Sequence, residues 1–97
     1  MRYRLHPEAE DDLRDGAEFY RERADASLSR SFLSEFRQSG NLLLRHPRLG
    51  ALWRKGTRRL VMNHFPYSLI YTISGEEIRI LAVAHHSRKP NYWRDRR

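Results

Sequence analysis

The sequence contains no cysteine and no long apolar run. Without cysteine the chain forms neither disulfides nor thiolate zinc sites, which fits a reducing compartment. Nowhere do 18 uncharged apolar residues follow one another, and the opening MRYRLHP is not followed by an apolar stretch of signal-peptide length. We therefore expect a soluble, unexported protein that acts in the cytoplasm and does not enter a membrane.

Metal-binding motifs are also missing, because neither HExxH nor CxxC spacing occurs. The only adjacent histidines are His85 and His86. Successive side chains of a strand point to opposite faces, so this pair cannot bind one metal ion while the strand continues. We expect neither a metal nor a cofactor, and interpret both histidines as residues at the end of a strand.

The 97 residues are enough for a single domain spanning 1–97. Their basic side chains outnumber the acidic ones and are unevenly distributed along the chain. The net charge is +7. Residues 1–44 hold 7 basic and 9 acidic side chains, whereas residues 45–97 hold 12 and 3. The second part therefore carries +9, and should attract phosphate backbones or an acidic protein segment.

The first part of the chain predicts a strand and a helical hairpin. Polar and apolar side chains alternate in residues 2–5, which predicts a short strand. Pro7 suits the first turn of a helix that continues to about residue 24. Residues 25–27 favour capping, and a second apolar stripe runs from residue 28 to 44, before Pro47 ends it.

The second part predicts a loop, HPRLGALWRKG, and then three antiparallel strands with alternating patterns, RRLVMNH, YSLIYTI and EIRILAVAHH. Ser74-Gly75 joins the last two strands as a hairpin. The order indicates an α+β fold, in which the helical hairpin covers one side of an antiparallel sheet that the N-terminal strand joins. A short turn or helix follows Pro90.

Alternation also predicts which face of each strand meets the helices. The helix-facing sets are Tyr67, Leu69, Tyr71 and Ile73 in one strand and Ile78, Ile80, Ala82 and Ala84 in the next. The opposite face of the last strand then carries Arg79, Leu81, Val83 and His85, which is more apolar than a solvated face usually is. We expect a partner to cover it.

The residues of the basic second part are suited to RNA cleavage, in which a base activates a 2′-hydroxyl, cations stabilise the charged phosphorane and an acid protonates the leaving oxygen. Arg58 or Arg59 and Arg88 are candidates for the cations, with Tyr92 or a histidine transferring protons. Trp93 is expected to be buried, and Tyr92 to face outward, where it is free to stack on a base or a partner.

Several of these segments resemble the RelE/ParE superfamily of toxins from type II toxin–antitoxin modules. The resembling features are the pair Arg58 and Arg59, FPY at Phe65–Tyr67, Tyr71, ILAVAH at Ile80–His85, Arg88, Pro90 and the pair Tyr92 and Trp93, together with HPEAEDDL and HPRLG in the first half. The resemblance covers nearly the whole chain and implies the same fold as the pattern.

The resemblance implies a growth-inhibiting toxin in a hetero-oligomer with a cognate antitoxin, which inserts an apolar and acidic segment along a groove. Residues for binding the antitoxin or the target are Arg58, Arg59, Leu81, Val83, His85, Arg88, Lys89 and Tyr92. The ParE-like branch poisons DNA gyrase without catalysis, and the overall pattern favours it. The RelE-like branch cleaves mRNA on the ribosome, and Arg59, Arg88 and Tyr92 are similar to part of its catalytic set. His85 is a further catalytic candidate under this ribonuclease hypothesis.

A third hypothesis is a non-toxic nucleic-acid-binding or interaction module. It depends on the basic tail, whose arginines are Arg94, Arg96 and Arg97. Contacts between such a tail and phosphates would make binding sensitive to salt.

Overall fold

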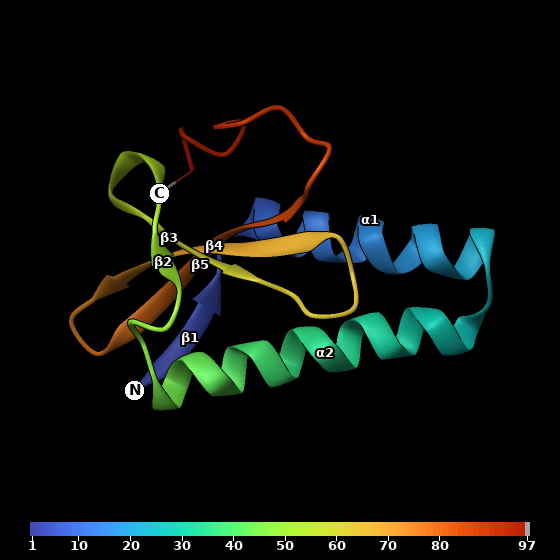
Figure 1. Ribbon diagram of the computed structural model, residues 1–97, viewed down its shortest axis with the longest axis horizontal. Helices are drawn as coiled ribbons and strands as arrows, with labels where there is room; N and C mark the ends of the chain where they lie inside the picture. Colours follow the sequence, from blue (N-terminus) through green and yellow to red (C-terminus); the bar gives the residue numbers. More distant parts are fainter. Residues whose placement is uncertain (97) are drawn as a thin grey trace.

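The helical hairpin and the predicted strands are present in the computed structural model, which describes residues 1–96 (Figure 1). The elements are β1 (Arg2–Leu5), α1 (Pro7–Arg23), α2 (Ala26–Arg45), β2 (Ala51–Leu52), a 3-10 turn η1 (Arg54–Gly56), β3 (Arg58–Val61), β4 (Tyr67–Ser74) and β5 (Glu77–His85). Segment HPRLGALWRKG, predicted as loop alone, thus contains β2 and η1. The tail after β5 forms consecutive turns, as expected.

Both helices begin at residues that satisfy the free N–H groups of a first turn. Nδ1 of His6 accepts a hydrogen bond from the backbone N–H of Glu8 at 3.1 Å, just before Pro7. Asp25 accepts one from Leu28 at 2.7 Å. The His6 cap thus begins α1 directly after β1, and the Asp25 cap begins α2 two residues after α1 ends. Neither helix in residues 1–96 combines the length and apolar character needed to cross a membrane.

The sheet has the order β1-β5-β4-β3-β2 and is mixed. β1 pairs with β5 in parallel, whereas the other pairs are antiparallel. As expected, β1 joins the antiparallel meander of β3, β4 and β5 in one sheet, and its own pairing with β5 is parallel. The helical hairpin returns the chain to the end of the sheet where β1 starts (Figure 1), so β3 runs in the direction of β1 and, after one reversal at β4, so does β5.

A β-bulge in β5 changes the predicted faces of that strand. Ile70 pairs with Ala82 and the next residue, Tyr71, pairs with Ile80, so Leu81 has no residue opposite it on β4. One extra residue shifts the alternation of everything that follows. Val83 therefore packs with the helices, and Ala82 lies on the other face.

The helix-facing core combines both helices with β4 and β5. It includes Phe32, Phe36 and Leu43 from α2 and Tyr67, Leu69, Tyr71, Ile78, Ile80 and Val83 from the strands. The prediction for β4 is confirmed at Tyr67, Leu69 and Tyr71. It is wrong in β5 for Ala82 and Ala84, because of the bulge.

The reverse face of the sheet, away from the helices, is covered in part by the C-terminal segment, residues 87–96 (Figure 1). Trp93 is buried there against Ile70 and Ala82, with Ala84 and Tyr92 packed around them. The burial predicted for Trp93 is confirmed. The chain's own C-terminal segment, rather than a partner, therefore covers this face where Trp93 packs on it.

Tyr71 ties the segment before β2 to the core. Its hydroxyl donates to the carbonyl of Pro47 at 2.7 Å and accepts from the N–H of Gly50 at 2.9 Å. Tyr71→Phe should lower the free energy of unfolding by about 1–3 kcal/mol, because two buried backbone groups lose their partner. Urea denaturation measures this. Tyr3→Phe is the matched control, and an equal loss in both variants would contradict the role of the Tyr71 hydroxyl.

Candidate functional site

A small basic cavity lies on the reverse face, between the end of β5, the C-terminal segment and the loop before β3. Its volume is about 110 Å³. It is lined by Trp53, Arg59, Ser68, Ile70, Ala84, His85, His86, Arg88, Lys89, Pro90, Asn91, Tyr92 and Trp93. The structure thus brings together the four residues predicted for a ribonuclease site, Arg59, His85, Arg88 and Tyr92.

Arg59 is held from two sides. Its guanidinium lies over the ring of Trp53, 4.6 Å from the ring centre, and its Nε donates to the hydroxyl of Ser68 at 3.1 Å. The same hydroxyl lies 3.0 Å from Nε2 of His86. Trp53, Arg59, Ser68 and His86 therefore form one connected row along the cavity.

His86 is a residue that sequence reasoning missed. Burial, the positive charge of Arg59 and the neighbouring His85 lower the pKa of His86, so its ring is neutral at pH 7. His85 lies on the other face, where its ring meets Tyr67 edge-on at 4.9 Å and its Nδ1 accepts from the N–H of Ser87. Alternation predicted His85 on the reverse face. The ring of His85 instead packs against Tyr67, and both His85 and His86 line the cavity.

Tyr92 lines the cavity with its ring, whereas its hydroxyl points elsewhere. Arg88 stacks on that ring at 4.0 Å, while the hydroxyl donates to Oδ2 of Asp12 at 3.0 Å. Burial and the adjacent Asp12 carboxylate raise the pKa of Tyr92. The prediction that Tyr92 faces outward is wrong, because α1 offers its hydroxyl a carboxylate partner.

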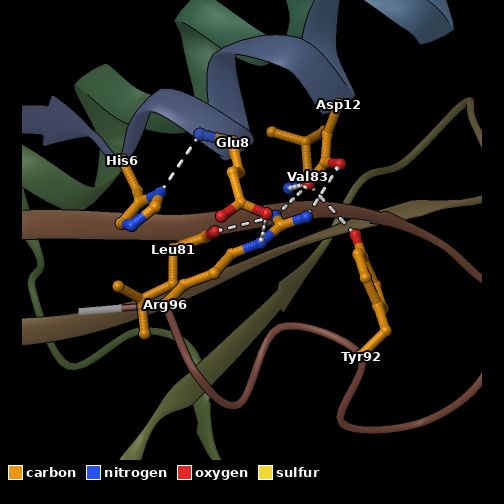
Figure 2. Close-up of polar contacts among 7 residues, drawn as sticks. All are labelled: His6, Glu8, Asp12, Leu81, Val83, Tyr92 and Arg96. Carbon is orange, nitrogen blue, oxygen red and sulfur yellow. Dashed lines mark hydrogen bonds and ion pairs between the residues drawn. The ribbon is translucent and has the colours of Figure 1, made fainter.

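Asp12 is the centre of a cluster that joins α1, β5 and the C-terminal segment, as Figure 2 shows. Its Oδ2 accepts from Nη1 of Arg96 at 2.6 Å, from the hydroxyl of Tyr92 and from the backbone N–H of Val83 at 3.1 Å. Arg96 also donates to the carbonyl of Leu81 at 3.1 Å. We name these residues the Asp12 cluster.

The Asp12 cluster completes an edge of the sheet. β1 ends at Leu5, opposite Ile80, so the following residues of β5 have no strand beside them on that side. The carbonyl of Leu81 and the N–H of Val83 are instead satisfied by the side chains of Arg96 and Asp12. Unpaired backbone groups at such an edge would otherwise require water or another strand.

Arg96 was predicted to belong to an exposed basic tail, and this is wrong. Its side chain is 9% exposed and forms an ion pair with Asp12, whose side chain is equally buried, with Glu8 3.4 Å away from Nε. The sequence signal was an acidic residue on the inner side of α1, which needs a cation when it is buried. Arg97 lies outside the described residues.

A second, larger hollow, the helix-side groove, lies between α1 and the end of β5. Its volume is about 470 Å³, and it is lined by Asp12, Asp15, Gly16, Phe19, Tyr67, Val83, His85, Ser87 and Arg88. Phe19 is 46% exposed, which is unusual for a phenylalanine. His85 and Arg88 line both this groove and the basic cavity.

Of the remaining residues predicted to bind a partner, only Lys89 lines the basic cavity. Arg58 instead stabilises the loop before β2, because its Nη1 donates to the carbonyls of Arg48 and Gly50. Leu81 and Val83 are each 1% exposed. The expectation that these two lie on an open face is wrong, because the bulge turns Val83 toward the helices and the Asp12 cluster closes over this edge.

No grouping of three or more potential metal ligands among histidine, aspartate and glutamate occurs within residues 1–96. The polar groups of the basic cavity are mainly cationic and hydrogen-bond donors. Such a lining suits an anion or an acidic partner more than a metal ion.

The fold is that of a small α+β domain, in which two helices cover one face of a mixed sheet. A solved chain from the chromosomal ParDE toxin–antitoxin system of P. aeruginosa has a similar fold, with a TM-score of 0.78 and 19% sequence identity, over 88% of this chain and 95% of that chain. Residues 3–90 match the family model described as the ParE toxin of the type II toxin–antitoxin system parDE. The chain belongs to the ParE toxin family. No curated protein matches it.

Proposed function

We propose that this ParE-family toxin inhibits growth by poisoning DNA gyrase in the cytoplasm, and that a cognate antitoxin silences it in a hetero-oligomer. The observation that carries the proposal is the family match over residues 3–90. The geometry of Tyr92 supports a non-enzymatic action, since a hydroxyl committed to Asp12 is poorly placed to transfer a proton at the basic cavity.

A RelE-like endoribonuclease is the second candidate, and one observation favours it. Arg59, His85, Arg88 and Tyr92 line the same cavity. His86, which is neutral at pH 7, would serve as the base more readily than His85, because it is bonded to Ser68 beside Arg59. Gyrase remains the first choice because the proton donor that this mechanism requires is turned away.

Purified toxin added to gyrase separates the two candidates. We expect inhibited supercoiling and accumulated double-strand breaks, with transcripts intact during growth arrest. Cut mRNA together with unaffected supercoiling would overturn the gyrase proposal in favour of the ribonuclease. Normal growth with the folded protein present would favour a non-toxic binding module.

The antitoxin segment is proposed to occupy the helix-side groove. An apolar side chain of the antitoxin would pack on Phe19, and an acidic side chain would meet Arg88, which lines the same groove. Arg88 gives an acidic side chain a partner at the β5 side of the groove, while Asp12 and Asp15 line its α1 side. The exposed aromatic surface of Phe19 supports it independently.

Phe19→Ala should weaken antitoxin binding about ten-fold or more while growth inhibition persists, because truncating an aromatic anchor at an interface costs more than about 1 kcal/mol. Calorimetry with the neighbouring gene product that relieves growth arrest measures the affinity. Leu52→Ala is the matched control, since Leu52 is 76% exposed on β2 and does not line the groove. Equal affinities for wild type and Phe19→Ala would remove the groove from the proposal.

A further inference from the structure

The basic cavity contains positive charge that no carboxylate balances. Arg59, Arg88 and Lys89 line it, and the lining formed by residues 1–96 includes neither aspartate nor glutamate. The carboxylate nearest in the network, Asp12, is engaged by Arg96 and by the hydroxyl of Tyr92 on the far side of the Tyr92 ring. An anion in this cavity would therefore meet cations without a competing acidic group.

Each of the two arginines is positioned by an aromatic ring. The guanidinium of Arg59 lies over Trp53, 4.6 Å from the ring centre, and that of Arg88 lies over Tyr92 at 4.0 Å. Among the described partners, the side-chain hydrogen bond of Arg59 uses Nε, which leaves its Nη donors for a ligand. Aromatic stacking fixes the plane of a guanidinium, so that its N–H groups are arranged for the oxygens of a phosphate.

A third potential donor lines the same cavity. Oδ1 of Asn91 is buried and has no hydrogen-bond partner within the described part of the chain. Turning this amide by 180° would place its NH₂ group there, and an amide NH₂ donates to anions. Asn91 lies in a turn with φ of 66°, a backbone conformation that asparagine tolerates better than most residues.

The size of the cavity limits the ligand to a small group. A volume of about 110 Å³ suits a single phosphate group and leaves the attached sugars and bases outside. Trp53, 36% exposed at the rim, offers an aromatic surface next to that position. Base stacking on an aromatic ring beside a cationic groove is how proteins bind single-stranded nucleic acid.

We infer that the basic cavity binds one phosphodiester group of a nucleic-acid strand, through Arg59 and Arg88, with an adjacent base against Trp53. This site adjoins the helix-side groove and shares Arg88 with it, and the inference does not depend on gyrase being the target. It adds a direct contact with nucleic acid to the proposed action.

The test uses the full chain and two probes, inorganic phosphate and a short single-stranded DNA oligonucleotide. Phosphate should shift the NMR signals of Arg59, Ser68 and His86. The oligonucleotide should bind more tightly than phosphate and quench the fluorescence of tryptophan. Arg59→Gln should weaken both interactions about ten-fold or more, as expected for loss of a charge-assisted hydrogen bond.

Two matched variants keep the test decisive. Arg37→Gln removes the same charge from the exposed surface of α2 and should leave binding nearly unchanged. Ser68→Ala removes the partner of Arg59 and should weaken binding even if Arg59→Gln fails to fold. Equal losses in Arg37→Gln and Arg59→Gln, or phosphate-induced shifts confined to residues away from the cavity, would overturn the inference. Tighter binding of a phosphoserine peptide than of the oligonucleotide would overturn the assignment to nucleic acid. Failure of this test would leave the gyrase assay unaffected.

Discussion

Asp12→Ala should lower the free energy of unfolding by about 3–5 kcal/mol, because it leaves the buried guanidinium of Arg96 without its carboxylate. The variant also removes the acceptor used by the hydroxyl of Tyr92 and by the N–H of Val83. Urea denaturation gives the loss, and hydrogen exchange should show faster opening of the C-terminal segment than of α2.

Asp11→Ala provides the control, one position away on the same helix. Asp11 is 62% exposed and pairs with the exposed Arg14 three residues later, so its removal should change stability by no more than about 0.5 kcal/mol. A second control, Arg96→Met in the Asp12→Ala background, should recover part of the stability, because no buried charge is left unpaired. Similar losses for Asp11→Ala and Asp12→Ala would contradict the role assigned to the Asp12 cluster.

Phe32→Ala should cost about 3–5 kcal/mol, the range for removing a buried aromatic side chain. Phe32 is completely buried and lies within 5.4 Å, centre to centre, of the rings of Tyr20, Phe65 and Tyr67. Its ring also approaches Gly16, where a Cβ would lie 2.8 Å from it. The substitution would therefore leave a cavity where α1, α2 and the sheet all contact this ring. Thermal and urea unfolding both measure the loss of stability.

Phe19→Ala is the internal comparison for this prediction. Phe19 occupies α1 close to the same cluster but is 46% exposed, with contacts to Tyr20 and Arg23. Its loss should cost about 1 kcal/mol or less. If Phe19→Ala destabilised the chain as much as Phe32→Ala, the change in antitoxin affinity expected for Phe19→Ala could not be assigned to the groove.

The helices and most strands could be predicted from the sequence, because the hydrophobic patterns that mark them extend over many residues. The stripe through Phe32, Phe36 and Leu43, the first-turn position of Pro7 and the cap at Asp25 are local signals, and each is confirmed. The bulge at Leu81 was not predictable from alternation, since ILAVAH is apolar on both faces and fits either register. The two-residue strand β2 was too short to leave a pattern.

The candidate site was predicted in composition more than in arrangement. The cavity does contain Arg59, His85, Arg88 and Tyr92. Trp53 and Ser68 belong to no motif, and His86, rather than His85, is the histidine that contacts Ser68. The contacts of Asp12 with Tyr92 and Arg96 span most of the chain, and no local pattern encodes which charged residues will be buried together.

The 84-residue separation of Asp12 and Arg96 has a consequence for the timing of maturation. Translation delivers Asp12 early, yet its partner emerges only after all five strands have been made. Until then the margin of β5 remains unsealed and the polypeptide cannot reach its final packing. The buried carboxylate on α1 therefore waits for its cation until the segment after β5 has been translated.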